Sequence, residues 1–257
     1  MYPVSAPWKS RGLALLAVFG VLIAGSAALA DEQKGFKNLK VLPKYISEDQ
    51  LDETMHKFTQ ALGVRCDYCH VGEQGKPFSE WDFPADTKKP KEAARLMMQM
   101  TGDLNQKWVS QVKSDRPAPM RVGCATCHHG KPVPVALQDV LAETVSQKGA
   151  AAAVTQYREL REKYYGRDAY DFGEPPLNML ANDLSQEKKT TDAITLLELN
   201  AEFNPKSARV QTMLGGAYLD AGDKAKATAA YKKAIELNPN AEQAKRKLAE
   251  LEKGASK

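Results

Sequence analysis

The chain has 257 residues, enough for one large domain or two modest ones. Its contents of 43% hydrophobic and 26% charged residues are ordinary for a soluble globular protein. The formal net charge is only +4, and two of the basic residues, Lys9 and Arg11, lie in an N-terminal stretch that contains no acidic residue. This balance leaves no basic patch, so a nucleic-acid partner is excluded.

The N-terminus has the pattern of an export signal. Two basic residues precede an uncharged run from Gly12 to Ala30, and Ala28-Leu29-Ala30 is a small-x-small cleavage site. We therefore expect a cleaved signal peptide over residues 1–30 and a periplasmic protein. An uncleaved membrane anchor is the alternative, because the run is almost long enough to span a bilayer.

A helix is predicted after a polar tether that covers residues 31–44. Ser47 and Gln50 form a capping box, which marks the start of a helix, and Gly63 marks its end. One face of this helix carries apolar side chains at helical spacing, namely Leu51, Met55, Phe58 and Leu62.

Two C-x-x-C-H motifs contain all four cysteines of the chain. They are Cys66, Cys69 and His70, and then Cys124, Cys127 and His128. This is the attachment signature of a c-type haem, in which two thiols add to the vinyl groups of one porphyrin and the histidine ligates the iron. We therefore expect two covalently attached haems. Zinc would need four ligands brought together, and a disulfide would not require a histidine after each second cysteine.

The segment between the motifs is expected to be a loop followed by a second helix. Over residues 71–89, Phe78, Trp81 and Phe83 form either a lid on a porphyrin face or a local hydrophobic cluster. Pro90 suits a first helical turn, and the helix is predicted to run to about Val112. Met97, Met100, Leu104 and Trp108 share one of its faces, whereas Met98 points about 100° away.

The sixth iron ligands decide between electron transfer and bond chemistry. A methionine thioether opposite histidine raises the haem potential. Met55 is the candidate for the first haem, with its neighbour His56 as competitor, and Met97 or Met100 could serve the second. A methionine on an apolar helix face is ordinarily core filling, which remains the alternative. His129 lies too close to His128 to reach the opposite face of the same haem, and we expect it to contact a propionate or solvent.

The C-terminal part contains an internal repeat. Asn204-Pro205 recurs 34 residues later as Asn238-Pro239, within a composition dominated by Ala, Leu, Lys and Glu. Paired amphipathic helices with this period resemble the tetratricopeptide repeat. Units are predicted at 176–208 and 209–242, after a degenerate unit with helices near 136–146 and 150–165. A polar helix over 240–253 is expected to cap the array.

Around the motifs the chain resembles the cytochrome subunit of photosynthetic reaction centres. The resemblance covers about residues 50–135 and rests on three patterns: Met55 with Gly63-Val64-x-Cys-x-x-Cys-His, Ala94-Arg95-x-Met97-x-x-Met100 with Leu104-Asn105, and Cys-x-Thr-Cys-His-x-Gly with Pro132. In that family a methionine-bearing helix precedes each motif. The resemblance thus implies Met55 as sixth ligand of the first haem and Met97 of the second, with Met100 in reserve. One bis-histidine haem in the family keeps His56 as an option.

Two departures from the family shape the functional expectation. The chain has two motifs instead of four, and it adds helical repeats, so it looks more like small dihaem relatives of non-photosynthetic bacteria. We expect an all-α protein, with a loop-rich dihaem cytochrome c domain over 31–135 followed by a helical-hairpin repeat domain over 136–254.

The expected function is one-electron transfer between redox partners, without substrate turnover. The partner is expected to be another cytochrome or a membrane oxidoreductase complex, with peripheral membrane association as an option. The repeats are expected to dock the partner or, alternatively, to stabilise the haem domain. A dihaem enzyme (a peroxidase or a small-molecule reductase) or a haem-based sensor is the competing reading, and either needs a five-coordinate iron.

Overall fold

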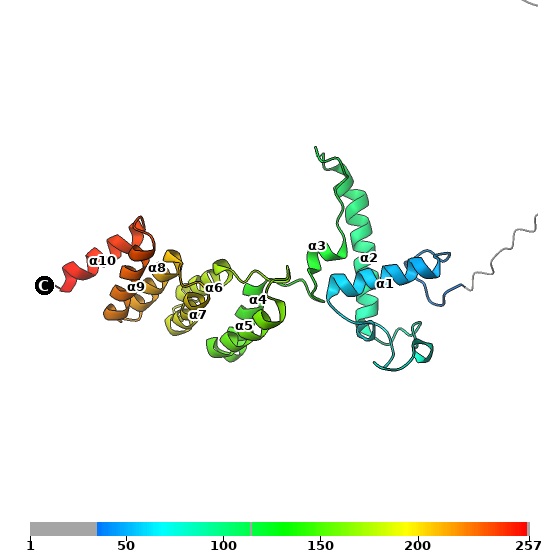
Figure 1. The fold of residues 1–257 in the computed structure, drawn as a ribbon, viewed down its shortest axis with the longest axis horizontal. Helices are drawn as coiled ribbons and strands as arrows, with labels where there is room; N and C mark the ends of the chain where they lie inside the picture. Colours follow the sequence, from blue (N-terminus) through cyan, green and yellow to red (C-terminus); the bar gives the residue numbers. More distant parts are fainter. Residues whose placement is uncertain (1–34, 114, 256–257) are drawn as a thin grey trace, which may run out of the picture. The chain divides into compact units, whose positions relative to one another are not determined.

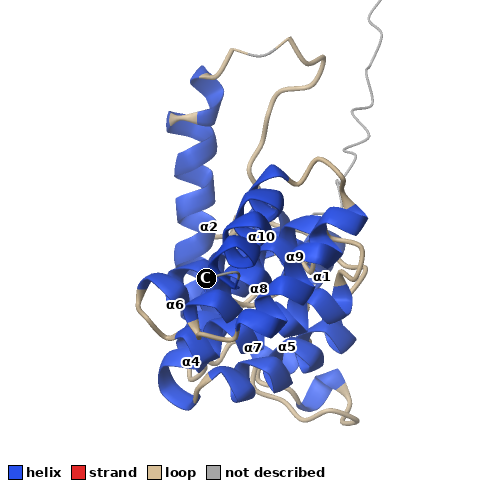
Figure 2. Ribbon diagram, turned by 90° about the vertical axis from the view of Figure 1, so that its left-hand side faces the viewer, coloured by secondary structure: helices blue, strands red, loops and turns tan. Residues whose placement is uncertain are grey.

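The computed structural model of the protein describes residues 35–113 and 115–255 (Figure 1). All regular elements in these ranges are helices, as Figure 2 shows, and one isolated bridge joins Val71 to Asp82. The predicted all-α fold is therefore confirmed. The predicted signal peptide or anchor at 1–30 lies outside the described residues, and no helix inside them is long and apolar enough to cross a membrane.

Helix α1 (Glu48–Leu62) begins and ends where the sequence predicts. The Gln50 backbone N–H donates to Ser47 Oγ at 3.3 Å, and the Ser47 N–H donates to Gln50 Oε1 at 3.2 Å. Gly63 closes the helix in the left-handed conformation with φ +63°. A Cβ at this position would lie 2.1 Å from the carbonyl oxygen of Gly130, so only glycine permits this approach.

Helix α2 (Lys89–Lys107) starts at the predicted place, with Pro90 in its first turn. It ends earlier than the predicted Val112, because Trp108 leaves the α-helical conformation with φ −123°. A 3-10 turn, η3 (Val109–Gln111), follows. No side chain of α2 is buried.

The two C-x-x-C-H motifs adopt different local structures. The first forms a 3-10 turn, η1 (Cys66–Tyr68), and the second forms the short α-helix α3 (Cys124–His128). Between η1 and α2 the chain is loop, as predicted, with one further 3-10 turn, η2 (Phe78–Glu80).

Seven helices follow in the described part of the chain, three pairs that the repeat pattern predicts and a final capping helix. They are α4 (Leu137–Lys148), α5 (Ala150–Tyr164), α6 (Glu174–Gln186), α7 (Thr190–Phe203), α8 (Ala208–Asp220), α9 (Lys224–Leu237) and α10 (Glu242–Ala255). The capping helix α10 begins two residues later than predicted. Before it, the Asn240 backbone N–H donates to Asn238 Oδ1 at 2.9 Å, so residue 240 lies in a turn. The domain division at residue 135 stays a prediction.

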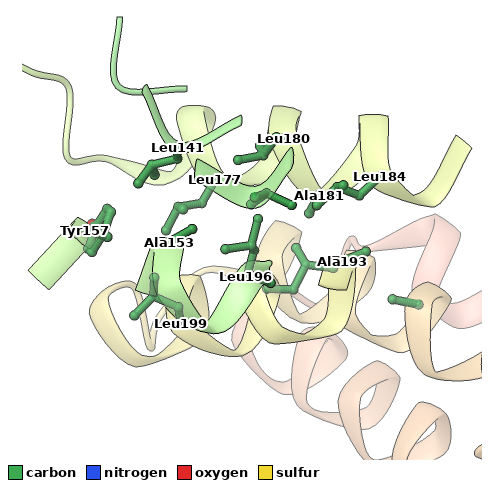
Figure 3. Packing of buried hydrophobic residues seen from close by; sticks show 14 of the residues in the cluster. Leu141, Ala153, Tyr157, Leu177, Leu180, Ala181, Leu184, Ala193, Leu196 and Leu199 are labelled. Atoms are coloured by element: carbon green, nitrogen blue, oxygen red, sulfur yellow. The ribbon is translucent and has the colours of Figure 1, made fainter. Parts of the chain in front are cut away.

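The apolar core lies in the repeats. Leu141, Leu177 and Leu196 are fully buried in one cluster that extends from α4 to α9, as Figure 3 shows in part. A smaller cluster around Tyr231 continues it to α10. Each fully buried leucine stabilises the fold by about 1.5–3 kcal/mol. Among the described residues from 36 to 136, by contrast, only Ile46 and Ala61 are buried hydrophobic residues.

Candidate haem-binding site

The first motif is wound into a tight turn that brings its side chains together. The backbone N–H groups of Cys69 and His70 both donate to the carbonyl of Cys66, at 3.2 and 3.0 Å. The ammonium of Lys88 donates to the Asp67 carbonyl, and Gln74 Nε2 donates to the Asp67 carboxylate at 2.7 Å. Both thiols are partly buried, and burial raises the pKa of Cys69.

The ring of His70 is fixed by one backbone carbonyl. Its Nδ1 lies 3.1 Å from the carbonyl oxygen of Phe83, and a carbonyl only accepts hydrogen bonds. Nδ1 therefore carries the hydrogen, and Nε2 keeps the lone pair that a metal requires. Burial lowers the pKa of His70, which favours the neutral imidazole.

The ring of His128 is held in the same way by a different segment. Its Nδ1 lies 2.8 Å from the carbonyl oxygen of Lys131, three residues further along the chain. At the start of α3 the Gly123 backbone N–H donates to Thr126 Oγ1 at 3.0 Å, which fixes the first turn of the motif. Both motif histidines thus present Nε2 as the free basic nitrogen.

Aromatic rings pack beside His70. Phe83 meets the His70 ring edge-on with centroids 5.1 Å apart, and Trp81 stacks on Phe83 at 5.6 Å. Phe78 touches both from the side. Gly72 permits this packing, since a Cβ there would lie 1.9 Å from the Trp81 ring. The rings form the predicted local cluster, and their role as a porphyrin lid stays a prediction.

The candidate methionines lie on α1 and α2. Met97 and Met100 are 38% and 43% exposed, whereas Met98 is less exposed. Met55 is half-buried on α1. Which iron each thioether ligates stays a prediction.

The two remaining histidines lie at the surface. His56 is exposed, and its Nε2 lies 3.4 Å from the Asp52 carboxylate on the same helix. His129 caps the end of α3 in the left-handed conformation, with φ 48°, and it is exposed.

Hydrogen bonds tie both methionine helices to residues that flank the second motif. Asn105 of α2 donates through Nδ2 to the Val122 carbonyl at 2.7 Å and accepts the Val122 N–H at 2.8 Å. At the end of α1, the Ala61 carbonyl accepts the Gly130 N–H at 2.9 Å. Sequence reasoning assigned Asn105 no such role, because only the fold brings Val122 to it.

The sequence pattern also did not predict a charged cluster next to the first motif. The Asp86 carboxylate pairs with Lys40 at 2.7 Å, Lys91 at 3.1 Å and Arg95 at 2.8 Å. Hydrogen bonds from Asn38 and from these three cations hold the pKa of Asp86 well below its usual range. The charges are spread from residue 40 to 95, so no local sequence pattern marks them.

The ammonium of Lys91 reaches further than this ion pair. It donates to three consecutive carbonyls, of Phe83 at 2.8 Å, Pro84 at 2.9 Å and Ala85 at 2.7 Å. The Phe83 carbonyl therefore accepts from both His70 and Lys91.

Lys131, beyond the second motif, is 6% exposed. Its ammonium donates to the Val135 carbonyl at 2.9 Å and lies 3.9 Å above the centre of the Tyr170 ring. Burial lowers the pKa of Lys131.

The chemistry of these residues fits c-type haems. Each motif offers two thiols and a histidine whose tautomer leaves Nε2 free, and thioethers lie on the helices that precede them. This part of the chain also exposes large apolar side chains, which could pack against the porphyrin ring of a haem. They are Phe78, Phe83, Leu96, Met97, Met100, Trp108 and Met120. Among the residues that the structure describes, no group of three or more His, Cys, Asp and Glu side chains could hold a metal ion.

Comparison with protein families gives two matches. The profile described as "Photosynthetic reaction centre cytochrome C subunit" matches residues 23–188, more than half of the chain. The tetratricopeptide repeat profile matches residues 208–241. The second match coincides with α8 and α9.

Curated relatives match a shorter part. The photosynthetic reaction center cytochrome c subunit of Roseobacter denitrificans is 32% identical over 101 residues, which are 38% of this chain and 25% of that protein. The protein of the same name from Rubrivivax gelatinosus is also 32% identical over 101 residues, which are 38% of this chain and 24% of that protein. The chain thus spans about a quarter of the length of these relatives.

Solved structures similar to the chain include helical-repeat proteins. The Sgt2 TPR domain from Aspergillus fumigatus is 22% identical and covers 47% of this chain and 77% of its own, with a TM-score of 0.33. MamA is 18% identical and covers 47% of this chain and 67% of its own, with a TM-score of 0.34.

Proposed function

The chain belongs to the family of photosynthetic reaction centre cytochrome c subunits, and from this premise we propose that it is an exported electron carrier with two covalently bound haems. The family supplies the haem and the electron-transfer role. The count of two rests on the two C-x-x-C-H motifs, and export rests on the signal pattern of residues 1–30.

The observation that carries the proposal is the matched setting of His70 and His128. Each imidazole donates through Nδ1 to a backbone carbonyl, at 3.1 and 2.8 Å, and offers Nε2 to an iron. When bound, each haem supplies an iron that gains and loses one electron. The protein's part is to hold both rings in one tautomer, so that neither needs to move a proton as the iron changes charge.

Methionine ligation would close both irons to substrates. We assign Met55 to the first haem and Met97 to the second, with Met100 as the reserve. A haem held by a methionine and a histidine would favour the ferrous state and would leave its iron no position for a substrate. The protein is therefore a carrier, and a peroxidase, a small-molecule reductase or a sensor is the alternative that an open iron would support.

The repeats supply a docking surface for the redox partner. A pocket opens between α6, α8 and α10, and its lining mixes apolar and polar side chains such as Met179, Met213, Asn182 and Arg209. Repeat solenoids use such surfaces to bind segments of other proteins. Another cytochrome or a membrane oxidoreductase complex is the proposed partner class.

The test is a spectroscopic haem count on the exported, mature protein. We expect two haems per chain, a methionine–iron charge-transfer band in the ferric spectrum and no carbon monoxide binding by the ferrous protein. Replacing both cysteines of one motif by alanine, first at 66 and 69 and then at 124 and 127, should each remove one haem. Rapid carbon monoxide binding by the unaltered protein would contradict the closed carrier and favour an enzyme or a sensor.

A further inference from the structure

The hydrogen bonds that hold the two motif histidines are not equivalent. The Phe83 carbonyl accepts His70 Nδ1–H and also the ammonium of Lys91, which lies 2.8 Å away. The Lys131 carbonyl accepts His128 Nδ1–H at 2.8 Å, and within the described ranges no second side-chain donor reaches it.

A cation on the shared carbonyl weakens that carbonyl as an acceptor for the histidine. The oxygen gives part of its electron density to the ammonium, so His70 Nδ1–H is polarised less and its ring stays a poorer electron donor. A metal-ligating histidine is made more basic by the acceptor at its other nitrogen, and a weaker acceptor therefore stabilises ferric iron less. This raises the reduction potential of the haem that His70 ligates.

The charge of Lys91 acts in the same direction. Its side chain is 12% exposed and that of Arg95 is 13% exposed, so solvent screens them less than surface charges. Lys40, Lys91 and Arg95 pair with the carboxylates of Asp86 and Glu92, and the ammonium of a further cation, Lys88, donates to the Asp67 carbonyl of the motif itself. A net positive charge favours the ferrous state, which carries one positive charge less.

The second site has a different arrangement. The ammonium of Lys131 donates to Val135 and faces the Tyr170 ring, so it does not share the carbonyl that holds His128. An ammonium over an aromatic ring keeps its charge, so Lys131 also favours the ferrous state of the second haem, and the difference between the two sites lies in the shared Phe83 carbonyl.

We propose that Lys91 is a positioning residue whose ammonium, placed on the Phe83 carbonyl, makes the haem at Cys66–His70 the higher-potential one of the pair. The inference rests on the proposed dihaem carrier. With both haems bound, the haem held by Cys66, Cys69 and His70 would be the first to be reduced.

The experiment is a spectroelectrochemical titration of the two-haem protein and of charge variants. Lys91→Gln keeps an N–H donor and removes the charge, and it should shift the potential of the first haem downward while leaving the second nearly unchanged. Asp86→Asn removes the opposing charge and should shift the same haem upward. The first haem is assigned by proton NMR, through the contact of its histidine with the Phe83 ring, whose centroid is 5.1 Å from that of His70.

Matched controls separate the proposed effect from general charge. Lys89→Gln makes the same change two residues away at an exposed position, and it should move both potentials little and equally. Lys91→Arg should restore most of the first haem's potential. Equal shifts for Lys91→Gln and Lys89→Gln, or a first haem of lower potential in the unaltered protein, would overturn the inference and leave the carrier function intact. A haem count other than two would instead remove the proposed function itself.

Discussion

At the scale of the residue, function depends on which nitrogen of each histidine is free. Both motif histidines donate from Nδ1 to a backbone carbonyl, but the two carbonyls lie at different distances along the chain. Phe83 is thirteen residues beyond His70, and Lys131 is three residues beyond His128. The motif itself could be recognised from the sequence because its spacing is local. The hydrogen bond from His70 to the Phe83 carbonyl could not be predicted, because the conformation of the loop decides which carbonyl lies next to the imidazole.

The methionine assignments are tested by single replacements. Met55→Ala is expected to leave one iron without its sixth ligand, so that the ferric spectrum becomes high-spin and the ferrous form binds carbon monoxide. Met97→Ala and Met100→Ala, made separately, should open the second iron in only one case. Met98→Ala is the control, because this side chain lies on another side of α2. An unchanged spectrum for Met55→Ala would rule out the first assignment.

At the scale of the element, helix ends explain how α1 meets the second motif. The left-handed Gly63 ends the helix, and its missing side chain leaves room for the Gly130 carbonyl. The ends of α1 could be predicted from the capping box and the glycine, which act within a few residues. The end of α2 was predicted wrongly, because apolar spacing continues through Trp108 while the backbone turns away.

Two glycines give a matched test of this packing. Gly63→Ala should destabilise the protein by more than about 1 kcal/mol, because alanine disfavours a positive φ and its Cβ would meet the Gly130 carbonyl. Gly102→Ala, in the middle of α2 with open space around it, should instead stabilise the protein by about 0.5–1 kcal/mol. Urea unfolding followed by circular dichroism measures both changes. Equal effects would show that the approach of α1 to residue 130 does not matter for stability.

At the scale of the whole molecule, burial is divided unequally. The repeats have a continuous apolar core, whereas the motif region buries few hydrophobic residues and exposes many large ones. The repeat helices could be predicted because a 34-residue period is visible in the sequence. The charged cluster at Asp86 could not be predicted, because Lys40 and Arg95 are distant in the sequence and only the tertiary fold brings them together.

A core replacement in the repeats tests this division. Leu196 is fully buried, and Leu196→Ala should cost about 2–5 kcal/mol of repeat stability. Thermal unfolding followed by circular dichroism should show the loss, whereas the haem spectrum stays unchanged. Met179→Ala, at a 53% exposed position of α6, is the control and should have little effect. A haem spectrum altered by Leu196→Ala would mean that both parts unfold together.

The bond between the Gly130 N–H and the Ala61 carbonyl has a consequence for the order in which the protein matures. Residue 61 leaves the ribosome well before residue 130, so α1 cannot acquire this contact until the second motif has been synthesised. Until then Cys66 and Cys69 lie in a segment whose ends are not joined, and the conformational entropy that closing the loop costs has not yet been lost. The contact thus closes a loop that contains both motifs, and it can form only after all four motif cysteines have been synthesised.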